Sequence, residues 1–506
     1  MANPSISSRF AFSVVANLLR GGLAFTTTII IARVLGPEVY GDYAFLLGSF
    51  VATMSLLNLG TSNAFQTFMS QKGRGKMFVF SYAGWQLLQI LLVLFVIGVI
   101  LPAQWLDQIW LGHEKGIVLL AVAAVFMQQR AWRTMIQIGE SKRLTHRVQM
   151  LNISIAAVHF VLVIGFWMGE MLSIRLVFGL ILIEHLIFLF VACKVLFIFR
   201  LEGEPFDGRS VLREYVQYCT PLIIYSIVGF GYEFADRWML QNFGGSKQQG
   251  LYEIGYRFGA LSLLITASLL NIFWKEIAEA KEKGNLELMQ KLYRKTSRFL
   301  FTLAVVIAGF LVPWSEEIIQ LLLGSSYAEG SSVLAIMLVL SAFASLSQIN
   351  GSMLLASGKT KAHFAFGSIL MGLSIPCSYF ILASEEAYLP GLQLGSLGLA
   401  VKMLVFTILH VNVVSWWISR DHGWKFDWIY QGVSLGGALG LGWLSFEVVE
   451  ILSNVIPSGL ILKGGLTLLL YCGFAGMMIW GMPWIAGTSR QEIKNYASRL
   501  VRLART

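Results

Sequence analysis

Charged residues are scarce in this chain, which disfavours the soluble protein classes. Only 13% of its 506 residues are Asp, Glu, Lys or Arg, whereas soluble domains carry about 25%. Long hydrophilic stretches are also missing, so no segment can form a separate soluble domain around a core of its own. Hydrophobic residues make up 56% of the chain and recur in long runs from end to end. This composition predicts an all-α integral membrane protein that crosses the bilayer many times.

Cysteine pairs, nucleotide-binding loops and catalytic sets are missing as well. The four cysteines have neither disulfide-framework nor metal-site spacing; they are Cys193, Cys219, Cys377 and Cys472. No Gly-x-x-x-x-Gly-Lys-Ser/Thr loop occurs, so direct use of ATP is not expected. The loops, at most about 20–25 residues long, hold no carboxylate pair and no nucleophile–base set. We therefore expect a protein that is not an enzyme and uses neither cofactor nor metal.

Fourteen apolar segments are long enough to cross a bilayer. A hydrocarbon core about 30 Å thick needs roughly 20 helical residues. The segments are continuously apolar, without the alternation of barrel strands, so helices are expected. The expected spans are residues 10–32, 43–65, 77–101, 117–138, 149–168, 173–198, 217–240, 253–274, 299–323, 331–356, 362–382, 393–418, 429–449 and 461–484.

Basic residues occupy every second loop between these spans. They include Lys72, Arg74 and Lys76 after the second span and a dense cluster after the eighth, within residues 275–298. The intervening loops hold few cations, and two of them carry paired glutamates. This alternation predicts that both termini, including the basic tail from residue 490, lie in the cytoplasm. The net charge of +10 then reflects membrane topology, and no nucleic-acid partner is expected.

A short motif occurs twice, each time between two apolar segments. Its two copies, 209 positions apart, are Gly36, Gly41 and Tyr43 within residues 33–43, and Gly245, Gly250 and Tyr252. The glycines allow a tight reversal with positive φ, and the aromatic ring suits the membrane–water boundary. A single copy would be an ordinary helix–helix loop, but two copies indicate an internal repeat.

Further matches extend the repeat. Leu111-Gly112 matches Leu323-Gly324, and residues 139–142 match residues 358–361. Each repeat then holds six helices, an even number, so the two bundles run the same way across the membrane. The predicted domains are an N-lobe (1–200, helices 1–6), a C-lobe (201–419, helices 7–12) and a C-terminal helix pair with its basic tail (420–506). Two parallel bundles are typical of transporters whose substrate path lies between them.

Several cations fall inside the expected spans. A charge at mid-membrane costs about 3 kcal/mol or more, so it usually faces a partner or a cavity. Arg20 and Lys402 have no acidic residue three or four positions away on their own helix, while Arg130 and Arg133 share a face of the fourth span. With Arg257 toward the outer side, these residues predict a cationic path for a polyanion, because guanidinium matches phosphate geometry. Arg133 could instead extend to the cytoplasmic interface.

Acidic residues inside the spans have two interpretations. Glu233 with Arg237, and Glu253 with Arg257, are spaced i, i+4 and could form self-contained ion pairs. Glu184 and Asp236 have no such partner. His159 and His410 are expected to be packed or hydrogen-bonded.

Taken together, several motifs resemble those of a known family. They are Asn17-Leu-Leu-Arg20, residues 31–41, Asp236-Arg-Trp-Met-Leu with Gly250-Leu-Tyr and Tyr256-Arg257, Leu323-Gly-Ser-Ser-Tyr, and residues 356–361. The chain resembles bacterial polysaccharide-unit flippases, the O-antigen and exopolysaccharide translocases of the multidrug/oligosaccharidyl-lipid/polysaccharide exporter superfamily. The resemblance covers roughly the first 420 residues.

The resemblance implies a function in the plasma (inner) membrane. Such a protein would flip an undecaprenyl-pyrophosphate-linked oligosaccharide from the inner to the outer leaflet. Coupling to protons or sodium would use Glu184, Glu233 or Asp236. The implied partners are the lipid-linked substrate, membrane lipids, and the polysaccharide polymerase and chain-length machinery.

Three alternatives remain open at this stage. A flippase for lipid II or a teichoic acid precursor would share the fold and the cationic path. A drug/cation antiporter of the same superfamily would need an acidic cavity, whereas the unpaired deep charges here are mostly basic. A membrane-bound glycosyltransferase or polymerase would normally show a larger extramembrane loop.

Overall fold

The computed structural model describes residues 6–203, 206–455 and 459–495, and these residues contain helices but no β-strand. Each of the fourteen expected spans lies mainly on helix, which confirms the all-α membrane fold. Among the described residues, nine helices are long and apolar enough to cross a membrane, or eleven if two bent pairs each count as one span. The number fourteen therefore stays a prediction. The end of the expected basic tail, from residue 496, lies outside the described residues.

Contacts divide the chain into two compact units. The first comprises residues 1–253 and 371–399, and the second comprises residues 254–370 and 400–506. The three long helices α11 (Gly245–Glu282), α15 (Thr360–Leu382) and α16 (Gly395–Asp421) each contribute residues to both units. The division into N-lobe, C-lobe and appended helix pair stays a prediction.

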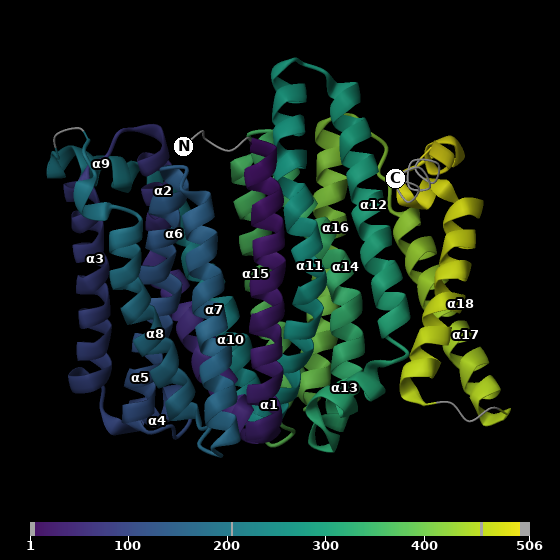
Figure 1. The fold of residues 1–506 in the computed structure, drawn as a ribbon, viewed down its shortest axis with the longest axis horizontal. Coiled ribbons are helices and arrows are strands. Elements are labelled where there is room, and N and C mark those ends of the chain that lie inside the picture. Colours follow the sequence, from purple (N-terminus) through teal and green to yellow (C-terminus); the bar gives the residue numbers. More distant parts are fainter. Residues whose placement is uncertain (1–5, 204–205, 456–458, 496–506) are drawn as a thin grey trace. The chain divides into compact units, whose positions relative to one another are not determined.

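The first unit is built around α1 (Ile6–Asn58), which packs against α7 (Thr145–Met168) and α10 (Ile223–Met239). Its other helices are α2 (Thr61–Gln71), α3 (Lys76–Phe95), α4 (Ala103–Trp110), α5 (Lys115–Phe126), α6 (Trp132–Ser141), α8 (Ile174–Val195) and α9 (Gly208–Cys219), which Figure 1 draws in purple to teal. Aromatic rings fill the end of the unit where α2 and α3 meet. Phe65 stacks on Phe78 and Tyr82, with ring centroids 5.5 and 4.3 Å apart.

The second unit is built around α12 (Leu286–Leu311), which packs against α14 (Ser331–Ala356) and α17 (Ile429–Val455). The remaining helices of this unit are α13 (Ser315–Leu323) and α18 (Leu460–Gly481). A methyl group on Gly442 of α17 would overlap the carbonyl of Gly309, so these two glycines let α17 and α12 approach closely. Tyr471 of α18 also donates a hydrogen bond to the Val306 carbonyl at 2.8 Å. The final helix pair is therefore firmly packed on α12.

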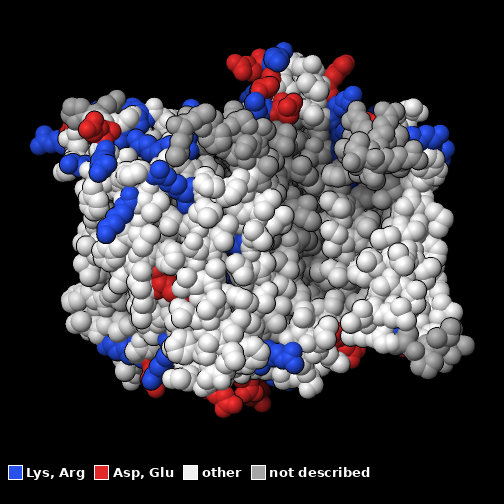
Figure 2. Space-filling view, in the orientation of Figure 1, with Lys and Arg blue, Asp and Glu red and all other residues white. Residues whose placement is uncertain are grey.

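Figure 2 shows how charge is distributed over the face that it draws. Lys, Arg, Asp and Glu gather at the two ends of the helices, and the surface between them is almost uncharged. This pattern is the one that a hydrocarbon layer imposes on spanning helices.

The two motif copies adopt the same backbone conformation. Gly36 interrupts α1 with φ 73° and ψ 168°, and Gly245 opens α11 with φ 77° and ψ 174°. Only glycine adopts this region without strain. The second glycines pack reciprocally: a methyl group on Gly41 would overlap the Ser246 carbonyl, and one on Gly250 would overlap the Pro37 carbonyl. Each contact joins the same two motif positions, as a local two-fold relation requires, so the structure supports the internal repeat.

Of the two further sequence matches between the repeats, the structure supports one and contradicts the other. Gly112 and Gly324 both have positive φ, of 80° and 91°, as expected for equivalent turns. The match of Gly139 with Gly358 is wrong. Gly139 is helical and lies against Val148 and Leu196, whereas Gly358 has φ 74°. The left-handed residue after α6 is Arg143, so close helix packing, and not a turn, explains Gly139.

Candidate functional site

Two of the predicted path cations make no hydrogen bond or ion pair with the described residues, although the charge of Arg133 is felt by Glu140. Arg20 lies on the first half of α1 and Arg133 lies on α6, and both side chains are exposed. Neither forms a hydrogen bond or an ion pair with any residue that the structure describes. These two guanidinium groups therefore keep all their donors available for a ligand.

Arg130 has a different environment, because it is buried with only 4% of its surface exposed. It lies on η2 (Met127–Ala131), a single π-helical turn between α5 and α6, a feature common at functional sites. Its guanidinium donates to the Gln89 side-chain oxygen at 3.0 Å, and Gln89 donates onward to the Leu57 carbonyl at 2.7 Å. No carboxylate among the described residues pairs with Arg130. Its guanidinium is therefore met by one neutral amide, with Tyr82 nearby, and its buried Nε atom has no hydrogen-bond partner in the described part of the chain.

A polar network surrounds Arg130 inside the first unit. Gln86 of α3 donates to the Thr134 hydroxyl at 3.0 Å, and Gln137 donates to the Ser62 hydroxyl at 2.9 Å. These bonds tie α6 to α2 and α3. The network fixes η2 and α6, the adjoining segments that carry Arg130 and Arg133.

Glu184 is a buried carboxylate on α8 with 4% of its surface exposed. His159 of α7 binds it through Nδ1 at 2.9 Å. The hydrogen bond expected for His159 is thus present, and its partner is a residue that the sequence marked as a candidate for ion coupling. His410 likewise lies 3.2 Å from the Ser347 hydroxyl through Nδ1. His185 binds the Ile181 carbonyl of its own helix at 2.7 Å.

The charged residues of α10 face other elements of the first unit. Asp236 is buried and accepts a hydrogen bond from the Ser378 hydroxyl of α15. Arg237 donates to the backbone carbonyl of half-buried Glu233 at 3.3 Å, and its guanidinium lies against Gly48 of α1, where a methyl group would overlap it. These contacts support a structural role for α10 in holding α1 and α15 together.

One charged cluster escaped the sequence reasoning. Asp42, inside the first motif copy, accepts from the Ser246 hydroxyl at 2.5 Å and from the Gln241 amide at 2.9 Å. The Nε2 atom of His113 lies 3.4 Å from the same carboxylate. Asp42 thus links both motif copies to the turn between α4 and α5. Asp42 could have been recognised in the sequence, because it lies between Gly41 and Tyr43 and is therefore part of the motif.

The remaining candidates belong to the junction and to the second unit. Glu253 is buried at the end of the first unit, four residues before half-buried Arg257 on α11. Lys402 on α16 is buried with 2% exposed. Since Arg20, Arg130 and Arg133 belong to the first unit, the continuous cationic path stays a prediction. Among the described residues, no group of three or more His, Cys, Asp or Glu side chains could hold a metal ion.

Comparison with known families decides the classification. The model of the family described as "Polysaccharide biosynthesis protein" matches residues 8–273, more than half of the chain. The chain belongs to this family. A second model, described as MatE, matches residues 221–380. The superfamily resemblance inferred from the motifs is confirmed. No curated protein matches the chain.

Solved structures show the same fold at low identity. The chain is similar to the lipid II flippase MurJ in an inward closed conformation, with 13% identity, a TM-score of 0.70, and coverage of 93% of this chain and 99% of MurJ. It is also similar to a MATE family multidrug transporter in outward-facing and inward-facing conformations. The outward-facing form has 13% identity, a TM-score of 0.56, and coverage of 82% of this chain and 95% of the transporter. The inward-facing form has 13% identity, a TM-score of 0.55, and coverage of 81% and 94%. With its apolar helices, this family member is a multi-pass membrane protein.

Proposed function

We propose that this family member flips an undecaprenyl-pyrophosphate-linked oligosaccharide repeat unit from the inner to the outer leaflet of the plasma membrane, for polysaccharide biosynthesis. The observation that carries the proposal is Arg20, an exposed cation within an apolar helix that has no acidic partner among the described residues. A charge in this position is costly unless it meets an anion or water. A pyrophosphate offers that anion, and its paired oxygens match the planar donors of arginine.

The other cations extend the same argument. Arg133 is exposed and makes no hydrogen bond or ion pair with the described residues, and it lies three residues after Arg130 on a segment fixed by the polar network. Arg133 would meet the pyrophosphate at the cytoplasmic mouth of the path, Lys402 would meet it deeper, and Arg257 would meet it toward the outer side. The substrate would move by alternating access, with both termini of the protein in the cytoplasm.

The closed contacts between the motif copies support entry from the cytoplasmic side. In the expected topology both copies lie at the outer end of the helices. There Gly41 and Gly250 pack reciprocally, and Asp42 is bound by Ser246 and Gln241. These contacts would have to separate before the substrate could leave outward.

Ion coupling is assigned to Glu184 and His159 within this proposal. The buried carboxylate and the imidazole form a pair that can share a proton between α7 and α8. Asp236 suits the role less well, because its hydrogen bond from Ser378 fastens two helices together. A drug/cation antiporter would need an uncommitted buried acid, whereas Glu184 and Asp236 both have partners.

The test is a leaflet-resolved assay in cells lacking the protein. Lipid-linked oligosaccharide should accumulate on the cytoplasmic leaflet and clear when the wild-type gene is restored. Arg20→Ala should insert normally and fail to clear it. Arg209→Ala, which removes an exposed arginine of α9 outside the expected spans, is the matched control and should clear it.

Two outcomes would contradict the proposal in different ways. Normal clearance by a stably inserted Arg20→Ala protein would remove Arg20 from the substrate path. Accumulation of lipid II or of a teichoic acid precursor, in place of the oligosaccharide, would assign the same cations to another lipid-linked anion.

A further inference from the structure

A groove of about 420 Å³ lies at one end of α12, and none of the residues assigned to the transport path lines it. It is formed by the first turns of α12 together with η7 (Pro483–Ala486) and the residues that follow η7. Four of its lining residues are cations, and they are Lys291, Arg294, Lys295 and Arg298. Their spacing of i, i+3, i+4 and i+7 places all four on one face of the helix. Two acids, Glu287 and Glu492, also line the groove, so cations are in excess.

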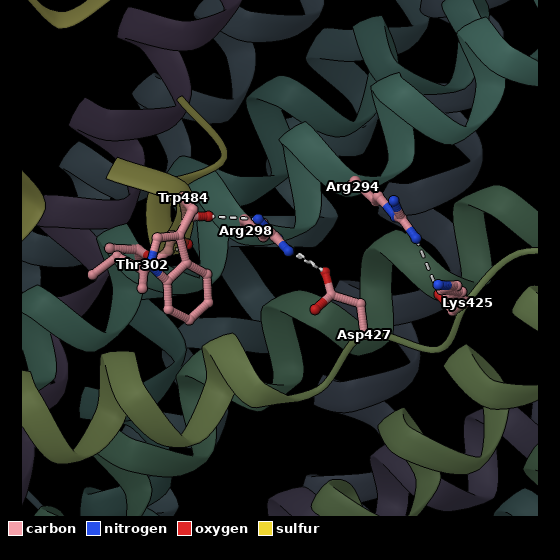
Figure 3. Close-up of polar contacts among 7 residues, drawn as sticks. Arg294, Arg298, Thr302, Lys425, Asp427 and Trp484 are labelled. Atoms are coloured by element: carbon pink, nitrogen blue, oxygen red, sulfur yellow. Dashed lines mark hydrogen bonds and ion pairs between the residues drawn. The ribbon is translucent and has the colours of Figure 1, made fainter. Parts of the chain in front are cut away.

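Two of the four cations are held by the protein. Arg298 binds the Asp427 carboxylate at 2.7 and 2.9 Å and donates to the Trp484 carbonyl at 2.7 Å (Figure 3). Lys295 forms an ion pair with Glu492 at 2.8 Å. These contacts fix the walls of the groove, because they join α12 to the segments on both sides of it.

The other two cations are available to a ligand. Among the described residues Arg294 has a single acceptor, the Lys425 backbone carbonyl at 3.1 Å (Figure 3). Lys291 is exposed, and it makes no hydrogen bond or ion pair with any residue in the described ranges. One ammonium group and a guanidinium group with unused donors therefore line a groove whose walls are fixed by their neighbours.

Tryptophans mark this end of the helices as a membrane boundary. Trp484 lines the groove and is 39% exposed, and Trp480 and Trp428 are 43% and 56% exposed. Amphipathic rings of this kind lie at the level of lipid headgroups. Further cations reach the same level, since Lys494 lies over the Trp480 ring at 5.9 Å and Arg490 donates to the Trp480 carbonyl.

We propose that this groove binds the phosphate headgroup of an acidic phospholipid. Lys291 and Arg294 would hold the phosphate, and the lipid tails would run down the apolar helices beside Trp484. In the predicted topology the groove faces the cytoplasmic leaflet, where acidic lipids attract basic segments. The bound lipid would bridge α12 and η7, and so would brace the final helix pair. The proposal needs only a membrane-embedded chain, and it stands or fails independently of the transported substrate.

The test measures lipid retention by native mass spectrometry of the full-length protein released from nanodiscs. Wild type should retain phosphatidylglycerol and not phosphatidylcholine. The double variant Lys291→Gln/Arg294→Gln should retain phosphatidylglycerol about tenfold less, since each removed cation weakens the attraction to an anionic surface. The control Lys283→Gln/Lys361→Gln removes the same charge from exposed positions outside the groove and should behave as wild type.

Folding is checked by the thermal midpoint in phosphatidylcholine nanodiscs, which should be the same for wild type and both variants. Equal retention of phosphatidylglycerol by all three proteins would overturn the proposal. If millimolar inorganic phosphate displaced the lipid or were retained equally well, the groove would be a site for free phosphate, and the lipid assignment would be wrong.

Discussion

The reciprocal glycine contact between the motif copies makes a sharp prediction. Gly41→Ala and Gly250→Ala each add one methyl group where a backbone carbonyl already lies, that of Ser246 and of Pro37 respectively. A carbonyl on a packed helix cannot rotate away as a long side chain can. Such overpacking costs about 1–3 kcal/mol. Either substitution should therefore destabilise the closed arrangement of the two copies.

The two substitutions should also be strongly coupled. Both methyl groups press the same pair of segments apart, so once the first has separated them the second meets little resistance. The double variant should then lose clearly less stability than the sum of the single variants, by an interaction energy of about 1 kcal/mol. Two unrelated clashes would instead add.

The assay is unfolding in mixed micelles, with Gly22→Ala as the matched control. Gly22 is a helical glycine of α1 with no atom within 4 Å of an added methyl group, so its replacement should be neutral or slightly stabilising. A Gly41→Ala protein as stable as Gly22→Ala would refute the contact. Strict additivity in the double variant would refute the reciprocal geometry.

Two further predictions concern ionisable groups. Burial by itself would raise the pKa of Glu214 on α9, but hydrogen bonds and charges from Lys72 and Arg74 hold that pKa below its ordinary value. The pairing stabilises the fold at pH values above the unfolded-state pKa of Glu214, and this stabilisation is lost as the pH falls. Glu214→Gln should therefore lower the free energy of unfolding by about 0.5–1 kcal/mol at pH 7 and by less at pH 4. An equal loss at both pH values would argue against the pair. Glu184→Gln keeps the shape of the buried side chain but cannot carry a proton, so it should slow flipping several-fold and flatten the pH dependence of the flipping rate, measured in vesicles. A Glu184→Gln protein with the wild-type pH profile would exclude Glu184 from coupling.

The fold class could be predicted from sequence because a helix that crosses a bilayer must consist mainly of apolar residues. Continuous apolar runs and alternating basic loops are direct consequences of the bilayer, and they needed no tertiary information. The first glycine of each motif copy was equally readable, since Gly36 and Gly245 have positive φ, whereas the second glycines, Gly41 and Gly250, do not and serve close packing instead. Gly139 shows the limit of that reasoning. A glycine can also serve close helix packing, and spacing alone cannot separate the two uses.

The candidate site was predicted less completely, for a physical reason. Intramembrane charges can be read from sequence, but their partners come from other helices. Glu184 meets His159 across 25 positions, and Asp42 meets Ser246 across 204. The sequence of the π-helical turn that carries Arg130 does not differ in any recognisable way from that of the α-helices on either side. Spacing rules based on a single helix therefore found the charges and missed the clusters.

The two halves of α1 differ in a way that links the hinge to the charge. After Gly36 the helix is deeply packed, and Tyr40, Phe45 and Leu46 are fully buried. Before it, Leu18 and Leu19 are 50% and 56% exposed, and Arg20 is exposed beside them. Both halves belong to the first unit, and Phe12 of the first half packs on His146 of α7, with ring centroids 4.3 Å apart. The break at Gly36 thus separates a deeply packed segment from one whose helix surface is exposed around Arg20. Arg20 lies 16 residues before Gly36, about 24 Å along the helix. A rotation of about 10° at Gly36 would therefore move this guanidinium by about 4 Å, because the displacement grows with the distance from the break. Gly36→Ala, which strains a backbone conformation that only glycine adopts freely, is therefore expected to shift the position of Arg20 as well as the local fold.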